Sequence, residues 1–279
     1  MTGGRDGGNV SGMTSQLSVD RDGDIAVVSV LTPTMPPALF AELGEAFADL
    51  SRDAALRAVI LRGSGKVFSY GLDLPAAFAS WGPAFSGQGL AAARTELWTL
   101  IRDIQATITA VASCPAPVIA AVHGWCVGGG IDLITACDLR ICSADARFSV
   151  RETKVAMVAD LGSLQRLPLV IGDAATRELA LTGKDIDASR ALALGLVSQV
   201  VTDRASLDTA ARALAAEIAG NPPLVVRGVK RVLDHATRRD VAEGLERVAL
   251  WNAAFLPSED LAEAASAFAA RRTPVWKGR

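Results

Sequence analysis

Short β-branched runs alternate with longer stretches of helical spacing along the first two thirds of the chain. Residues 25–31 and 58–62 are apolar runs flanked by turn residues, which predicts two strands, and an Ala-, Leu- and Phe-rich stretch at about 37–50 predicts a helix between them. A long helix is predicted at about 88–113. The apolar run at 116–122 that follows is typical of a strand covered on both faces. This alternation indicates an α/β fold.

The pattern changes toward the end of the chain. Helical spacing at 131–137 precedes two further strand-like runs, and from about Ser206 only helical patterns remain. The last predicted helix, at about 258–271, begins with Ser258 as its N-cap. We therefore expect a mobile Gly-rich tail at 1–16, an α/β core at 17–205 and an all-helical region at 206–279.

Composition narrows the possible functions. Half of the 279 residues are hydrophobic, and the net charge of −2 disfavours a nucleic-acid partner. The apolar runs are far shorter than the ~20 residues of a membrane-spanning helix. Four cysteines without a C-x-x-C pair, and no recognisable signal segment, favour a cytoplasmic location. Two histidines are too few to favour a zinc site or a Ser-His-Asp triad, so we expect no bound metal.

Two glycine-rich turns are the candidate sites of chemistry. In VHGWCVGGGIDL, at 122–133, a strand is followed by glycines and then by a helix, whose free N–H groups can bind a phosphate or a carbonyl oxygen that gains negative charge. The spacing is neither G-x-G-x-x-G nor a P-loop. GSGKVFSYGLDL, at 63–74, also follows a strand, and two such turns could hold one oxygen between them. Taken alone, each turn is equally well explained as a structural connection.

Three acids near the first turn are candidate bases. Asp132 follows the glycines, Glu152 lies in RFSVRETK, and Asp160 lies in VAMVADLG. Proton transfer beside a thioester needs such a base together with an oxyanion hole. Each acid also has a structural explanation: Asp132 could complement a helix dipole, Glu152 could form a surface ion pair with Arg151 or Lys154, and Asp160 could cap a helix that begins at Leu161.

Several longer motifs resemble the crotonase superfamily, the enoyl-CoA hydratase and isomerase group of acyl-CoA enzymes. They are GKVFSYGLDL at 65–74, PVIAAVHGWCVGGGIDLITACDLR at 117–140, QRLP at 165–168 and the C-terminal SEDLAEAASAFAARRTPVWKGR. The resemblance implies that the backbone N–H groups of Leu72 and Gly129 hold the thioester carbonyl. It also implies that the substrate is bound near them by a set of neighbouring residues: Ser69, Tyr70, Gly71, Asp73 and Gly128. Tyr70 replaces the small residue usual at its position.

The acids resemble one branch of that superfamily in particular. Hydratases carry Glu at the positions of Asp132 and Glu152 and a Pro-Gly turn where this chain has Asp160. All three acids, together with WNAAFL at 251–256, resemble the Δ3,5-Δ2,4-dienoyl-CoA isomerases. The implied reaction removes a proton at C2 with Glu152 ionised as the base. Asp160, kept protonated by its apolar setting, adds one at C6, and Asp132 orients or tunes the pair.

The resemblance also implies an architecture and partners. We expect a core of stacked ββα turns in a superhelix, completed by C-terminal helices that assemble trimers or hexamers. The substrate is expected to be an acyl-CoA in fatty acid β-oxidation, with coenzyme A as the thioester part of the substrate and no separate cofactor. An enoyl-CoA hydratase, with Asp160 as a helix cap, and a catalytically silent acyl-CoA-binding paralogue remain alternatives.

Overall fold

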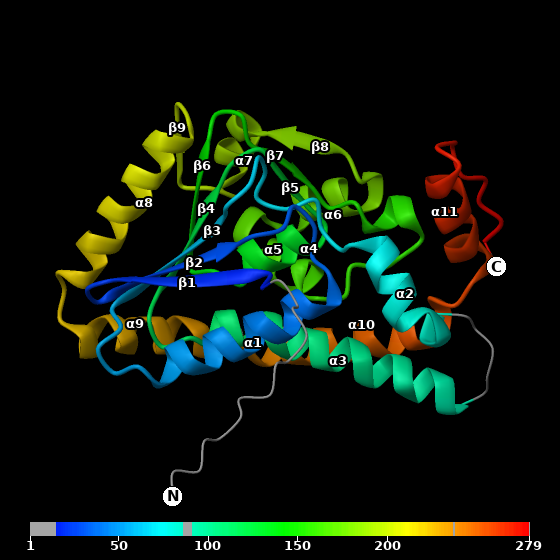
Figure 1. The fold of residues 1–279 in the computed structure, drawn as a ribbon, viewed down its shortest axis with the longest axis horizontal. Helices are drawn as coiled ribbons and strands as arrows, with labels where there is room; N and C mark the ends of the chain where they lie inside the picture. Colours follow the sequence, from blue (N-terminus) through cyan, green and yellow to red (C-terminus); the bar gives the residue numbers. More distant parts are fainter. Residues whose placement is uncertain (1–14, 86–90, 237, 279) are drawn as a thin grey trace, which may run out of the picture.

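The computed structural model describes residues 15–85, 91–236 and 238–278 (Figure 1). Of the expected tail at 1–16, all but Ser15 and Gln16 lie outside these ranges. Both residues are held at the Glu42 carboxylate, which accepts hydrogen bonds from the Ser15 hydroxyl at 2.8 Å and the Gln16 N–H at 2.9 Å.

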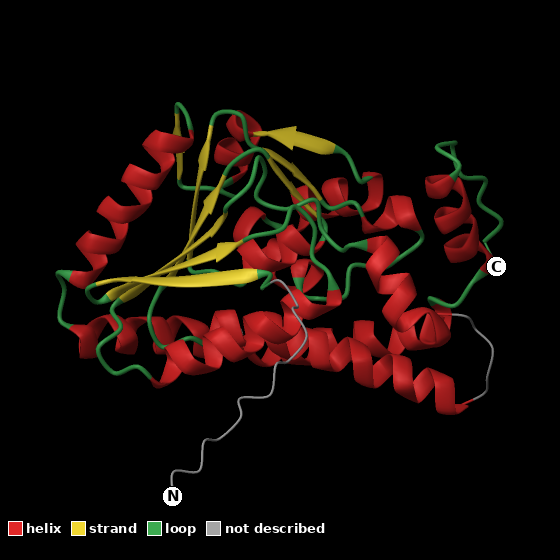
Figure 2. Cartoon of the chain, viewed as in Figure 1, coloured by secondary structure: helices red, strands yellow, loops and turns green. Residues whose placement is uncertain are grey.

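Two sheets form the described core. The larger has the strand order β1-β2-β3-β4-β6-β9 and is parallel except for the β1–β2 hairpin, while β5, β7 and β8 form a smaller sheet beside it (Figure 2). The strands are β1 (Leu17–Asp22), β2 (Ile25–Val30), β3 (Ala58–Gly63), β4 (Val118–Val122), β5 (Trp125–Val127), β6 (Leu139–Ser143), β7 (Arg147–Ser149), β8 (Asp185–Asp187) and β9 (Gln199–Val201). The strands predicted at 25–31, 58–62 and 116–122 are confirmed, and the two strand-like runs predicted after the helical stretch at 131–137 correspond to β6 and β7.

Strand β4 explains how the layers are held together. Its residues are all buried, and successive side chains enter opposite cores because side chains alternate along a strand. Ala120 packs into the cluster that contains α1 (Pro37–Arg52) and α3 (Ala91–Ser113), whereas Ile119 faces α8 (Arg204–Ala219). The sheet is thus covered on both faces, as the continuous apolar run predicts.

The remaining helices complete the described fold. They are α2 (Leu74–Phe85), α4 (Gly129–Thr135), η1 (Glu152–Val155), α5 (Ser163–Ile171), α6 (Asp173–Thr182), α7 (Ala188–Leu194), α9 (Pro223–His235), α10 (Arg238–Phe255) and α11 (Glu259–Ala269). Helix α10 packs along α3, and α11 packs against η1. The predicted cap of the last helix is confirmed, since the Ser258 hydroxyl accepts a hydrogen bond from the Leu261 N–H at 3.1 Å.

Candidate active site

The two glycine turns lie against each other. Ser69 of the turn after β3 donates its N–H to Trp125 O at 2.9 Å and accepts one from Val127 N at 2.9 Å, so it pairs with the strand that leads into the second turn. Further along, Leu72 forms a parallel bridge with Met35. Backbone hydrogen bonds therefore bring together turns that are about fifty residues apart in sequence.

Glycine is required where the turns touch. Gly71 has φ +84°, and a Cβ there would lie 2.7 Å from Val127 O. Gly128 has φ +53°, and its added Cβ would lie 3.3 Å from Glu152 Oε1. Both positions combine a backbone conformation that other residues rarely adopt with a close approach, so the glycines let two backbones and a carboxylate meet.

The backbone N–H groups of Leu72 and Gly129 lie close together. The Cβ position of Gly129 lies 3.9 Å from Leu72 N, and neither N–H donates to another group in the described part of the chain. Gly129 is the first residue of α4, where the N–H has no partner within the helix. Two fixed donors of this kind can stabilise an oxygen that becomes negatively charged.

Of the other residues expected to bind substrate, Ser69 and Asp73 form hydrogen bonds within the protein, whereas Tyr70 is half exposed. Ser69 is buried and its hydroxyl accepts from Gly71 N at 3.0 Å, which holds the turn itself. The Asp73 carboxylate accepts hydrogen bonds from Ala76 N at 3.0 Å and from the Thr34 hydroxyl at 2.8 Å, so it stabilises the start of α2. Tyr70 is half exposed, with its side chain available to a ligand.

Glu152 does not form the surface ion pair that its sequence neighbours suggest. Arg151 pairs with Asp185, and Glu152 Oε2 is buried with no hydrogen-bond partner in the described structure. Burial, followed by the charges of Asp132 and Asp160, raises the pKa of Glu152 to about 8. An unpartnered buried carboxyl oxygen is costly to keep in a fold, which is typical of a functional group.

Asp132 lies in the first turn of α4, and its side chain connects this helix to α5. The side chain is buried, and its Oδ1 accepts a hydrogen bond of 2.6 Å from the N–H of Ser163, the first residue of α5. Burial raises the pKa of Asp132 to about 6, although the Ser163 hydrogen bonds and the Arg166 charge oppose the rise. The acid is therefore held in place and also lies within electrostatic reach of the other two.

Asp160 does not cap α5. That helix begins at Ser163 with Gly162 as its N-cap, so the capping explanation of Asp160 is wrong. Instead Asp160 Oδ2 accepts a hydrogen bond of 2.7 Å from Asn252 Nδ2 on α10. Burial raises the pKa of Asp160 to about 7, with the Asn252 hydrogen bond lowering it and the Asp132 charge raising it.

The three acids form one electrostatic group. We expected Glu152 to be ionised and Asp160 to be the protonated acid. Both pKa values are raised to near neutrality or above, that of Glu152 to about 8 and that of Asp160 to about 7. Burial is the main cause for both acids; the charges of Asp132 and Asp160 add to it at Glu152, whereas the Asn252 hydrogen bond opposes it at Asp160. Asn252 is a site residue that sequence reasoning noted only as part of WNAAFL.

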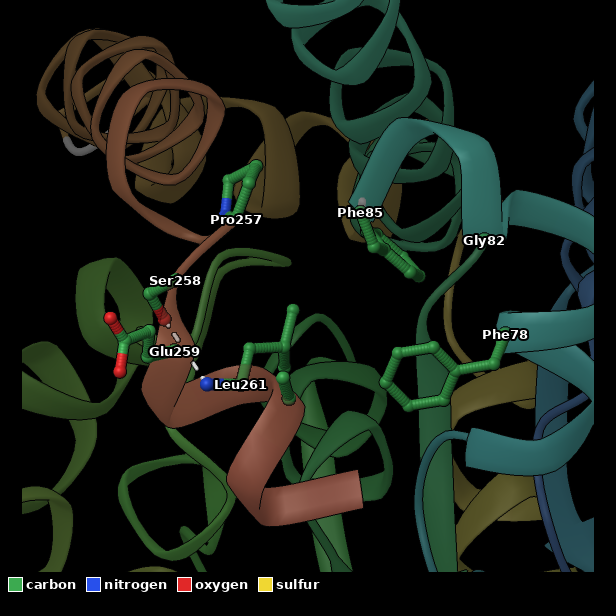
Figure 3. A pocket seen from close by; sticks show the side chains of 8 residues that line it. Phe78, Gly82, Phe85, Pro257, Ser258, Glu259 and Leu261 are labelled. Carbon is green, nitrogen blue, oxygen red and sulfur yellow. Dashed lines mark hydrogen bonds between the residues drawn. The ribbon is translucent and has the colours of Figure 1, made fainter. Parts of the chain in front are cut away.

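A cavity of about 560 Å³ lies between α2 and α11 (Figure 3). Its lining is mainly apolar and comprises Phe78, Gly82, Phe85, Pro257, Ser258, Glu259, Leu261 and Ala262. Helix α2 begins directly after the Leu72 turn, and α11 packs against the turn of helix that carries Glu152. Among the described residues, no cluster suited to a metal ion is found and no helix could cross a membrane.

Comparison with known proteins gives consistent matches over most of the chain. The sequence model of the enoyl-CoA hydratase/isomerase family matches residues 21–279. A mitochondrial Delta(3,5)-Delta(2,4)-dienoyl-CoA isomerase of Dictyostelium discoideum is 46% identical over 232 residues, covering 82% of this chain and 78% of its own. A peroxisomal protein of the same name from Arabidopsis thaliana is 45% identical, covering 84% of each chain.

The fold also matches a solved structure over most of the chain. A crystal structure of an enoyl-CoA hydratase/isomerase from Pseudoalteromonas atlantica superimposes with a TM-score of 0.82 at 26% identity, covering 94% of this chain and 100% of that one. The expected α/β superhelix with C-terminal helices is confirmed. The expected cytoplasmic location is wrong, because the similar isomerases are named mitochondrial or peroxisomal.

Proposed function

Because the chain belongs to the enoyl-CoA hydratase/isomerase family, we propose that it isomerises 3,5-dienoyl-CoA to 2,4-dienoyl-CoA in fatty acid β-oxidation. The observation that carries this proposal is the third buried acid. The charge of Asp160 acts on Glu152, and the charge of Asp132 acts on both of them. The relatives that are 41–46% identical carry the isomerase name, which supports the same reaction.

The reaction removes one proton from C2 and adds another at C6, so the substrate and the product have the same atoms. Glu152 takes a proton from C2, the electron pair shifts through the conjugated carbons, and Asp160 gives a proton to C6. Glu152 ends protonated and Asp160 ionised, so a proton must return before the next cycle. Two acids are needed because the two carbons are separated by the length of the diene, and one carboxyl group cannot reach both.

The intermediate is a dienolate whose charge is carried partly by the thioester oxygen. The N–H groups of Leu72 and Gly129 hold that oxygen, since both are fixed by the glycine turns and have no other acceptor among the described residues. Coenzyme A takes part as the thioester of the substrate. Asp132 lies next to the pair and tunes its protonation through its charge.

The raised pKa values support proton exchange by these acids near neutral pH. Burial raises the pKa of Glu152 to about 8 and that of Asp160 to about 7, so each group can gain or lose a proton in that range. The reaction requires the form in which Glu152 is ionised and Asp160 is protonated.

The acyl chain beyond the diene occupies the cavity between α2 and α11. Phe78 and Phe85 on α2 and Leu261 on α11 give it apolar walls (Figure 3). Burial of hydrocarbon there contributes roughly 0.8 kcal/mol for each CH₂ group. Tyr70 is half exposed on the Leu72 turn, and we propose that its side chain narrows the entrance for the acyl chain.

Residues 206–279 form an oligomerisation region beside a core at 17–205, and the protein assembles as a trimer or hexamer. Helix α9 supports this assignment, because Leu224, Val225, Val229, Val232 and Leu233 are all exposed on it. A cavity of about 1010 Å³ lined partly by the same helix lies beside them. Exposed apolar surface on this scale favours burial against another copy of the chain.

The proposal is tested by incubating the purified protein with a 3,5-dienoyl-CoA and following the ultraviolet absorbance of the conjugated 2,4-dienoyl thioester. Asp160→Asn is expected to lower the rate by about 10²- to 10⁴-fold, the usual contribution of a general acid. Asp203→Asn is the matched control, because Asp203 is an exposed N-cap of α8 and Asn caps equally well. Hydration of a 2-enoyl-CoA without isomerisation would instead identify a hydratase, and binding without turnover a silent paralogue.

A further inference from the structure

Asn252 connects the C-terminal helices to the third acid. It lies on α10 and is 2% exposed. Its Nδ2 donates to two oxygens, Asp160 Oδ2 at 2.7 Å and the backbone carbonyl of Val158 at 2.8 Å. Ninety-two residues separate Asn252 from Asp160 in sequence. The contact is therefore made only when α10 is in place.

The hydrogen bonds fix which way the amide is oriented. A backbone carbonyl can only accept, so the group that faces Val158 O must be the NH₂ of Asn252. The same NH₂ can only donate to Asp160 Oδ2. When Asp160 is protonated, its proton therefore resides on Oδ1, the oxygen that Asn252 does not contact.

A second buried amide holds the same loop through different atoms. Gln105 on α3 donates from Nε2 to the backbone carbonyl of Asp160 at 2.7 Å and to that of Leu245 at 3.0 Å. Gln105 thus anchors the main chain and α10, whereas Asn252 alone contacts the carboxyl group. The two residues allow the anchoring of the loop to be separated from the orientation of the acid.

We propose that Asn252 is a positioning residue for proton transfer at C6: it directs the acidic proton of Asp160 onto Oδ1 and holds that oxygen toward the diene. This inference rests on the proposed function. Without Asn252 the carboxyl group is free to rotate, and its proton divides between the two oxygens. Misplacement of a catalytic group by about 1 Å can cost about 10²-fold in rate, even when the fold is intact.

The test uses two near-isosteric variants, Asn252→Leu and Asn252→Asp. Leu keeps the volume and removes both donors, and Asp keeps the shape but places a like-charged group beside Asp160. Each is expected to lower kcat for isomerisation by about 10- to 100-fold, with KM changed much less, because the acyl-CoA contacts are untouched. Far-ultraviolet circular dichroism and thermal unfolding establish that the variants fold.

Kinetic isotope effects distinguish a role of Asn252 in proton transfer from a purely structural role. In the variants, protonation at C6 becomes slower than removal of the C2 proton. The effect of deuterium at C2 on kcat is therefore expected to fall relative to the wild type, and the effect of D₂O to rise. Gln105→Leu, which loosens the loop but leaves the Asn252 contact, is expected to keep the wild-type pattern of isotope effects.

Two results would overturn the inference: an unchanged kcat in both folded Asn252 variants, or a lower kcat with the isotope effects of the wild type. A wild-type protein that fails to isomerise 3,5-dienoyl-CoA would refute the proposed function instead. The two failures are distinct, because one concerns the variants and the other the wild type.

Discussion

Asp160→Asn is expected to make the protein more stable at neutral and alkaline pH while it removes activity. The carboxyl group of Asp160 is buried, with the Asn252 amide as its side-chain donor, and burial raises its pKa from 3.8 to about 7. Asn has nearly the same shape and can accept the same hydrogen bond without carrying a charge. The substitution therefore removes an ionisation that the native state resists.

The sign and size follow from linkage between proton binding and folding. Below about pH 4 the group is protonated in both the native and unfolded states, so it has no effect on stability. Between pH 3.8 and about 7 the native state holds a proton that the unfolded state has released, so the free energy of unfolding decreases as pH rises. The shift of about three units corresponds to about 4 kcal/mol at pH 8, the amount by which Asp160 destabilises the wild type.

The measurement is urea unfolding followed by tryptophan fluorescence at a fixed protein concentration and at several pH values from 4.5 to 8.5. The stabilities of the wild type and Asp160→Asn are expected to lie close together at pH 4.5 and to diverge by several kcal/mol at pH 8.5, with the variant more stable. Asp203→Asn, at an exposed helix cap, is expected to follow the wild type. Parallel curves for the wild type and Asp160→Asn would refute the argument, because they would mean that Asp160 ionises freely in the native state.

Two further changes test the pair of acids and the turns. The isomerase rate is expected to follow a bell-shaped pH profile with its maximum near neutrality, because low pH protonates the base and high pH ionises the acid. A flat profile of kcat/KM between pH 5 and 9.5 would contradict a pair that shares one proton. Gly71→Ala is expected to lower kcat by about 10²-fold, because its Cβ would lie 2.7 Å from Val127 O and force apart the turns that carry the two N–H donors. Product formation measured beside circular dichroism distinguishes this local effect from unfolding.

The sequence predicts best those features that depend on local pattern. β4 is recognisable because every position in it is apolar and β-branched or small. The Ser258 cap is recognisable because it precedes two acids at the start of a helix. Helix α2 is not predicted, since it contains Gly82 and Pro83, which weaken a helical pattern.

The site depends on contacts that no local pattern contains. Asp132 accepts from the N–H of Ser163, thirty-one residues away, and this contact shows that its position is fixed by the next helix. Glu152 has a raised pKa only because burial and two distant carboxylates surround it, whereas its neighbours in sequence suggest a surface ion pair. The resemblance to a family assigns these residues, but their raised pKa values follow only from the fold.

Each of the three acids is held in place by a different part of the fold. Glu152 is carried by η1 beside the Gly128 turn, and Asp132 is fixed by the start of α5. Asp160 is held from α3 and α10, on elements that do not form the oxyanion site. The acid that serves C6 can therefore be positioned independently of the base that serves C2. Changes at Asn252 should alter proton delivery without disturbing the N–H groups of Leu72 and Gly129, which is the separation that the isotope effects measure.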